Sequence, residues 1–213
     1  FAKLFTMQMD IVNTRPTYPV RLDSGAVPRL LLIRHSESAP VEGVSPEGWG
    51  LTEEGRRRCA ALAERLRGRD LPDLVASHEP KAAQTARLVA ERLGLPWQTA
   101  EGLHEHERDA MPWLGREHWE ARIAELFRRP DRLVFGRETA RAALERFAAA
   151  LEPIAAARPG ADVAIVTHGT VLTLFVARHN PVDPLAFWKA LAMPDLVELE
   201  LPSYRLIAGQ PSG

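Results

Sequence analysis

Residues 30–35 read Leu-Leu-Leu-Ile-Arg-His, and residues 163–168 read Val-Ala-Ile-Val-Thr-His. Each begins with a run in which every residue is apolar, so neither face of the strand would be exposed to water. This is typical of a central strand in a sheet that is covered on both faces. Amphipathic helices and short apolar runs alternate through the rest of the chain, which is typical of helices packed on both faces of a parallel sheet. The sequence therefore predicts a three-layer α/β/α sandwich with a mostly parallel sheet.

The other elements are expected from hydrophobic periodicity and capping residues. Thr52 and Thr139 are suited to cap the starts of two helices, and Gly94 is suited to end another. Apolar residues alternate with glutamates in 197–201, which predicts a half-exposed, antiparallel edge strand. The predicted strands lie at 30–33, 74–76, 163–166 and 197–201, and the predicted helices at 52–66, 81–93, 116–127, 139–154 and 169–178.

Length and composition favour one soluble domain. At 213 residues and 46% hydrophobic content, the chain can bury one sizeable core. Its 27 basic side chains nearly balance 28 acidic ones, so we expect no nucleic-acid or membrane partner. No apolar run reaches the ~18 residues of a membrane span. The single cysteine, Cys59, falls on the apolar side of a predicted helix and cannot form an internal disulfide, which favours a cytoplasmic location.

Residues 1–28 are set apart from the predicted domain. They hold scattered prolines without clear periodicity and lack an initiator methionine, so an origin partly outside the native chain is one interpretation. We expect an N-terminal extension at 1–28 and one folded domain at 29–213.

Two histidines stand where the central strands end, His35 after the first and His168 after the other. Ligands of open α/β sheets bind at the carboxyl ends of the strands, so the two imidazoles are expected in one pocket. Arg34 precedes the first histidine, and Lys81 opens a predicted helix. Two cations and two imidazoles near helix N-termini suit a dianionic phosphate. A neutral imidazole is also a competent nucleophile near pH 7 without a metal.

Five segments in order resemble the histidine phosphatase superfamily, which includes the cofactor-dependent phosphoglycerate mutases. The segments are Arg34-His35-Ser36-Glu37, Leu51-Thr52-Glu53-Glu54-Gly55, Lys81-Ala82-Ala83-Gln84-Thr85-Ala86 with the preceding Ser77 to Pro80, Leu103-His104-Glu105, and Thr167-His168-Gly169. Each is a weak signal alone, but five in the expected order make the resemblance specific. It runs through most of residues 29–201 and implies that 29–213 form a histidine phosphatase-like catalytic domain.

Carried over position by position, the resemblance implies that His35 is the nucleophile and Glu105 the proton donor. Arg34 and His168 would bind the phosphoryl oxygens. Lys81 stands where the superfamily usually has arginine. A guanidinium that could bind phosphate through two hydrogen bonds is thus replaced by an ammonium that acts as a point charge. The implied reaction is the hydrolysis of small phosphomonoesters through phosphohistidine, with no metal or other cofactor.

One replacement leaves two alternatives open. Ser36 follows the nucleophile where the superfamily usually has glycine, which adds a Cβ and a hydroxyl where the backbone normally approaches the ligand. Either the turn differs slightly, or the hydroxyl adds a hydrogen-bond donor to the site.

Simpler interpretations exist for several of these residues. A histidine after a buried strand is more often structural than catalytic when taken singly. Lys81 could be a solvated lysine. Glu138, at the start of a predicted helix, could help to order the pocket, although a surface residue is the simpler interpretation. The run 104–107, His-Glu-His-Glu, resembles a metal cluster but lacks the spacing of a helical zinc site, and no cysteine partner exists.

Two rival functions remain at this point. A mutase would return the phosphoryl group to a second substrate hydroxyl, although the Trp and Asn that commonly follow the first motif in mutases are absent after Ser38. A phospho-ligand binding protein could keep the fold and lose turnover, a possibility raised by Lys81 and Ser36. The sequence indicates neither the physiological substrate nor the oligomeric state.

Overall fold

The computed structural model describes residues 27–39, 41–42, 44–108 and 115–207. A five-stranded sheet runs through the middle of it in the order β3-β2-β4-β1-β5. The strands are β1 (Arg29–Arg34), β2 (Leu74–Ser77), β3 (Trp97–Ala100), β4 (Val163–Thr167) and β5 (Asp195–Glu200). The β1–β4, β2–β4 and β2–β3 pairs are parallel, and β5 runs antiparallel to β1 at one edge. The predicted sheet, mostly parallel with an antiparallel edge strand, is confirmed.

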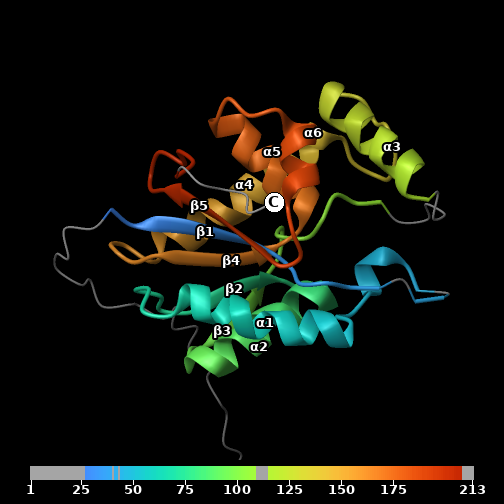
Figure 1. The fold of residues 1–213 in the computed structure, drawn as a ribbon. Helices are drawn as coiled ribbons and strands as arrows, with labels where there is room; N and C mark the ends of the chain where they lie inside the picture. Colours follow the sequence, from blue (N-terminus) through green and yellow to red (C-terminus); the bar gives the residue numbers. More distant parts are fainter. Residues whose placement is uncertain (1–26, 40, 43, 109–114, 208–213) are drawn as a thin grey trace, which may run out of the picture.

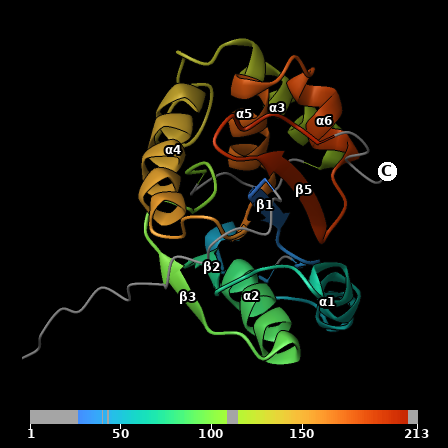
Figure 2. The same ribbon diagram turned by 90° about the vertical axis from the view of Figure 1, so that its left-hand side faces the viewer.

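Helices cover both faces of this sheet, as Figure 1 shows. One face is covered by α1 (Glu53–Leu66) and α2 (Pro80–Leu93), which pack against each other. The other face carries α4 (Ala140–Ala156) and α5 (Gly169–His179), with α6 (Pro184–Ala190) and α3 (Arg116–Arg128) beyond them (Figure 2). A 3-10 turn, Pro46–Gly48, lies before α1. The three-layer prediction is therefore confirmed.

The two central strands divide their side chains between two cores. In β1, Leu30 and Leu32 pack into the core beneath α4 and α5, whereas Leu31 and Ile33 pack into the core beneath α1 and α2. All four are 0% exposed. Because alternate side chains of a strand point to opposite faces, a strand covered on both sides must be apolar at every position. Burying one such side chain stabilises the fold by roughly 1.5–3 kcal/mol.

The expected caps form as the sequence predicts. The Thr52 hydroxyl oxygen accepts a hydrogen bond from Gly55 N at 2.9 Å, and that of Thr139 accepts one from Ala142 N at 3.1 Å. Gly94 ends α2 with a φ of 68°, in the left-handed region that favours glycine. Cys59 lies buried on the inner side of α1, as expected.

Strand β3, helix α6 and the 3-10 turn were not predicted. Strand β3 is an edge strand whose first three residues are exposed, so it shows no alternation of apolar and polar residues. Helix α6 is only seven residues long, and its Asp183 cap and Pro184 start are the signals that could have indicated it. No helix among the described residues is long and apolar enough to cross a membrane.

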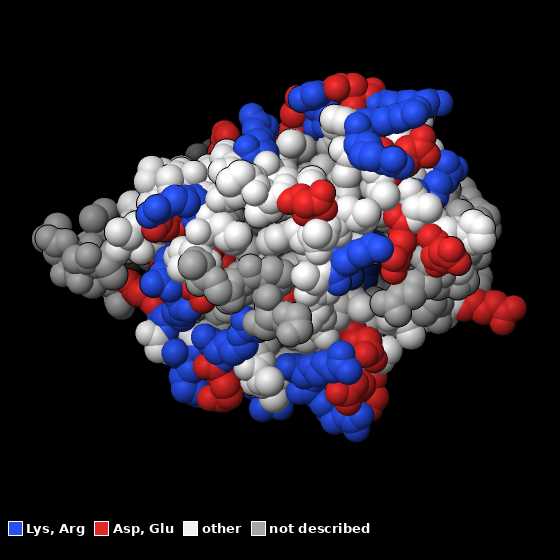
Figure 3. Space-filling view, turned by 45° about the horizontal axis from the view of Figure 1, so that its top comes forward, with Lys and Arg blue, Asp and Glu red and all other residues white. Residues whose placement is uncertain are grey.

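Charges of both signs are interspersed over the surface in Figure 3. Several are paired along helices, such as Arg57 and Arg58 with Glu54 on α1. The described residues on the face shown therefore present no broad field of a single sign.

The start of α1 is docked on the turn that follows His35. Glu37 O accepts a hydrogen bond from Thr52 N at 3.0 Å. Gly55 lies so close to the same carbonyl that an added Cβ would be 2.1 Å from the oxygen. The glycine of the Leu-Thr-x-x-Gly segment is therefore required by contact with the backbone of this turn.

Gly55→Ala should lower the free energy of unfolding by about 1–3 kcal/mol, the usual cost of overpacking. Gly50→Ala is the matched control, because its added Cβ would meet only the flexible Gln84 side chain, at 3.2 Å. Urea unfolding of the two variants and the parent checks this. Equal losses in the two variants would show that the contact with Glu37 does not constrain the fold.

Candidate active site

The parallel pairing of β1 with β4 places the two histidines side by side. Arg34 is the register partner of Thr167, so His35 and His168 follow neighbouring strand ends. His35 N donates a hydrogen bond to Thr167 O at 2.9 Å, and the two imidazole centroids are 5.2 Å apart. His35 is 7% exposed and His168 is 0% exposed. The structure thus brings the two predicted imidazoles into one buried site.

The hydrogen bond of His35 determines which ring nitrogen is available. Its Nδ1 lies 2.7 Å from Ser36 O. A carbonyl oxygen can only accept, so Nδ1 carries the hydrogen and Nε2 keeps a free lone pair. Burial, reinforced by the charges of His168 and Lys81, holds the pKa of His35 well below 6.5. The ring is therefore neutral at pH 7, in the form that can act as a nucleophile.

His168 has the complementary arrangement. Its Nε2 is 2.9 Å from Ser77 Oγ and 3.5 Å from Glu79 Oε1. Ser77 Oγ already accepts a hydrogen bond from Glu79 N at 3.2 Å, so its own hydrogen can be donated to Nε2. In that tautomer Nδ1 carries the ring hydrogen, and Nδ1 is buried with no hydrogen-bond partner among the described residues. Burial, followed by the charge of Lys81, lowers the pKa of His168 well below 6.5.

Arg34 presents a second buried donor at the same place. Its Nη1 donates to Leu191 O at 2.7 Å, whereas Nε has no hydrogen-bond partner among the described residues. The guanidinium lies against the first residue of α5, since a Cβ on Gly169 would be 3.2 Å from Arg34 Nε. An unsatisfied buried donor costs about 1–3 kcal/mol. An anion between Arg34 and His168 would satisfy both donors.

Lys81 is buried in an ion pair rather than solvated. It is 6% exposed, and its Nζ donates to Pro46 O at 2.8 Å and to Glu79 Oε2. The other oxygen of Glu79 accepts from Glu105 N at 2.8 Å. Glu79 therefore connects three of the predicted site residues, Lys81, His168 and Glu105. The sequence did not mark Glu79 as a site residue, because a glutamate before a helix is common at surfaces as well.

Glu105 lies buried at the start of α5. Its carboxylate accepts hydrogen bonds from three backbone N–H groups, those of His106, Thr170 and Val171, at 2.9, 3.1 and 3.2 Å. The guanidinium of Arg108 is 2.6 Å from Glu105 Oε2. Burial alone would raise the pKa of Glu105, but Arg108, His168 and the backbone donors outweigh it and hold the pKa far below its ordinary value. Glu105 is therefore ionised in the free protein.

A second ion pair orders the loop that carries Glu105. Arg146 donates to the carbonyl oxygens of Gly102, His104 and Glu105 at 2.8, 3.0 and 3.2 Å. Its guanidinium is 2.6 Å from the Glu138 carboxylate, which is only 12% exposed. The interpretation of Glu138 as a surface residue is wrong, because the fold brings this loop down onto α4.

Ser36 does not add a donor to the site. Its hydroxyl is buried and donates to Gly55 O at 2.7 Å, while its N–H donates to Thr85 Oγ1 at 3.0 Å. The side chain therefore anchors the turn to the helical layer of α1 and α2.

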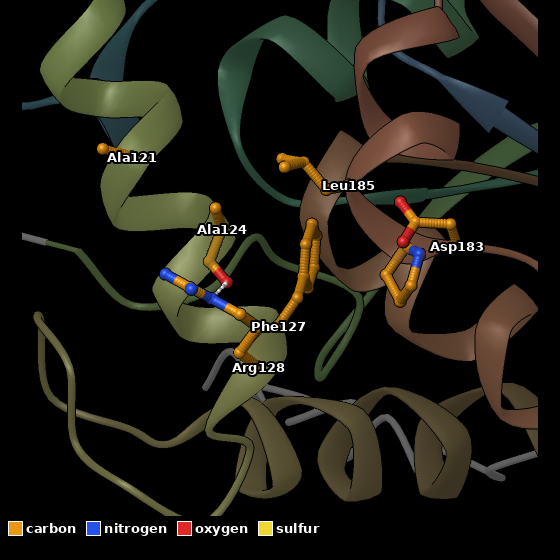
Figure 4. A pocket seen from close by; sticks show the side chains of 7 residues that line it. Ala121, Ala124, Phe127, Arg128, Asp183 and Leu185 are labelled. Carbon is orange, nitrogen blue, oxygen red and sulfur yellow. Dashed lines mark hydrogen bonds between the residues drawn. The ribbon is translucent and has the colours of Figure 1, made fainter.

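The described residues hold no group of three His, Cys, Asp or Glu side chains placed to bind a metal ion. A surface groove of about 460 Å³ lies apart from the histidines, between α3 and α6 (Figure 4). Phe127 and Leu185 face each other across it, and it is not lined by the histidines, Arg34, Lys81, Glu79 or Glu105.

The fold and the paired histidines define an α/β sandwich with a buried two-histidine site at its strand ends. Residues 30–204 match the histidine phosphatase superfamily (branch 1), and the chain belongs to this superfamily.

Solved structures share this fold. A mycobacterial glucosyl-3-phosphoglycerate phosphatase solved with VO3 is 25% identical, with a TM-score of 0.65, and the match covers 84% of this chain and 96% of that one. Mycobacterial hydrolase 1 is 23% identical, with a TM-score of 0.68 and coverage of 88% and 100%. A phosphoglycerate mutase from Bacillus anthracis str. Sterne is 16% identical, with a TM-score of 0.69 and coverage of 87% and 92%. No curated protein matches the chain.

The lowered pKa values of His35 and His168 predict that both rings stay neutral as the pH falls through 6.5. Below about pH 6.5 the histidines of the unfolded chain take up protons and those of the folded chain do not. The free energy of unfolding should therefore fall by about 1.4 kcal/mol for each histidine with every pH unit below this value. Ring ¹⁵N chemical shifts in a pH titration check the first statement, and urea unfolding checks the second. Protonation of either ring at or above pH 6.5 would contradict the burial argument.

Proposed function

We propose that the protein is a phosphatase that hydrolyses phosphomonoesters through a phosphohistidine at His35, without a metal or other cofactor. One observation carries the proposal: the bond from His35 Nδ1 to Ser36 O leaves Nε2 with a free lone pair, and the centroid of the His35 ring lies 5.2 Å from that of His168. Arg34 Nε, in the residue before His35, is a buried donor without a partner among the described residues. Membership of the histidine phosphatase superfamily supports it, as does the likeness to a phosphatase of known structure.

In the first step, His35 Nε2 attacks phosphorus, the N–P bond forms and the P–O bond to the alcohol breaks. Arg34, His168 and Lys81 neutralise charge on the three phosphoryl oxygens that stay with phosphorus. In the second step, water attacks phosphorus, and the N–P bond breaks to return neutral His35 and release inorganic phosphate. These side chains supply the charge stabilisation that a metal would otherwise provide.

Glu105 is the proposed donor of the proton that the leaving alcohol needs. Because it is ionised in the free protein, it must gain this proton when substrate binds. A phosphoryl dianion next to the carboxylate favours that uptake, since like charges disfavour the ionised form and raise its pKa. Water then gives its proton back to the carboxylate in the second step.

The proposed compartment is the cytoplasm, where thiols stay reduced, because Cys59 is free and buried. Transfer to a second substrate hydroxyl instead of to water is the rival reaction. Release of inorganic phosphate, rather than of an isomeric ester, separates the two.

His35→Ala should reduce the release of phosphate from p-nitrophenyl phosphate by roughly 10³-fold or more, because no neighbouring group can replace a covalent nucleophile. His118→Ala is the matched control, since His118 is exposed on α3. Steady-state rates and circular dichroism of both variants check the prediction. A folded His35→Ala protein that keeps more than a few per cent of the parent rate would exclude the phosphohistidine mechanism.

Glu105→Gln keeps the shape of the side chain and removes the acid. It should lower the rate on an alkyl phosphate by roughly 10²-fold, the usual scale of general acid catalysis, and much less on p-nitrophenyl phosphate, whose leaving group needs no proton. Glu107→Gln, in the same loop with a side chain 42% exposed, is the control and should show no such contrast. Equal losses on both esters for Glu105→Gln would mean that this carboxylate only positions groups around it.

A further inference from the structure

Arg108 is a cation that no sequence motif indicated. It follows Glu105 in the loop after β3, and its Nη2 lies 2.6 Å from Glu105 Oε2. Its Cζ lies 4.7 Å from the centroid of the Trp119 ring on α3. The Arg108 side chain is 21% exposed, against 9% for Glu105, so Arg108 is the more accessible partner of the pair.

The pair with Arg108 opposes the role proposed for Glu105. Three backbone N–H groups already bind this carboxylate, so Arg108 is not needed to satisfy it. After burial, which raises the pKa of Glu105, Arg108 is the charge that lowers it most. A proton donor must be neutral, and a neutral carboxyl group has lost its attraction to a guanidinium. When Glu105 becomes neutral, Arg108 loses this ionic partner, and a second anion could take its place.

The position of that anion follows from the position of the acid. A proton donor stands beside the oxygen of the leaving alcohol, and Arg108 is in direct contact with this donor. In the proposed mechanism, the phosphoryl oxygens contact other side chains, those of Arg34, His168 and Lys81. Arg108 is therefore placed beside the alcohol part of the substrate rather than beside its phosphoryl group.

We propose that Arg108 binds a second anionic group on the alcohol part of the substrate, such as a carboxylate or another phosphate. When it does so, its ion pair with Glu105 breaks. The inference rests on the proposed function, and it assigns the substrate class as phosphomonoesters that carry a second negative charge near the ester. A planar guanidinium fork matches both kinds of anion. The Arg108 Cζ atom lies over the Trp119 ring, a cation–π contact that does not use the N–H donors needed for the new partner.

The first test measures binding, so that it does not depend on turnover. Titration calorimetry on the His35→Ala protein compares the affinity for 2-phosphoglycolate with that for 2-hydroxyethyl phosphate. The first ester carries a carboxylate where the second carries a neutral hydroxymethyl group. The phosphate ester that carries the carboxylate, 2-phosphoglycolate, should bind at least about tenfold more tightly, which is the scale of a hydrogen bond to a charged group. Adding Arg108→Gln should remove this difference, whereas adding Arg122→Gln, an arginine of α3 with a side chain 42% exposed, should keep it.

The second test measures kcat/KM for the same two esters in proteins with His35 intact. Arg108→Gln should lower the value for 2-phosphoglycolate and raise that for 2-hydroxyethyl phosphate, because Glu105 is then free of its ion pair. A residue that only supports the structure would lower both.

Equal binding of the two esters by the His35→Ala protein would overturn the proposal, and so would parallel losses of kcat/KM in Arg108→Gln. A parent protein with no turnover of any ester, together with the binding contrast, would refute the phosphatase mechanism while supporting the anion site at Arg108.

Discussion

The parallel pairing of β1 with β4 is the interaction on which the rest of the site depends. Because Arg34 and Thr167 are register partners, the next residue of each strand is a histidine, and the two imidazoles meet without any long loop to position them. Both strands are covered on both faces, so a shift of one residue would move apolar side chains between the two cores. The burial that fixes this register also lowers the pKa values of His35 and His168 and keeps both rings neutral.

A second constraint is the balance of buried charge around these rings. Glu79 is paired with Lys81, and Glu105 with Arg108, both with little exposure to solvent. Losing one partner of a buried pair costs about 3–5 kcal/mol, so neither cation is simply free to bind phosphate. In the proposed mechanism, a phosphoryl group first contacts donors that have no partner among the described residues, such as Arg34 Nε. Further contacts would then require an exchange of partners inside the site, which would link substrate recognition to the protonation of Glu105.

Much of the fold could be predicted because its central strands are locally unambiguous. The apolar runs at 30–33 and 163–166, the caps at Thr52 and Thr139, and the left-handed glycine at Gly94 each carry a signal within a few residues. Strand β3 carries none, because an exposed edge strand is defined by the neighbour it pairs with rather than by its own pattern. The same distinction holds in the site. His35 and His168 could be placed together because they follow predicted strands. The hydrogen bonds of Glu105 with Arg146, Thr170 and Val171 could not, because they join residues that are 41 to 66 positions apart in the chain.

The central claim is that His35 Nε2 forms the covalent bond to phosphorus, since Nδ1 is committed to Ser36 O. The most direct measurement is on protein quenched in alkali during turnover of a phosphomonoester, digested, and analysed by mass spectrometry together with ³¹P and ¹⁵N NMR of the phosphorylated peptide. The account predicts one phosphoryl group on His35, attached to Nε2 and lost in acid. A phosphoryl group on Nδ1 or on another residue would contradict it, and so would turnover at full rate with no trapped intermediate under conditions that preserve phosphohistidine.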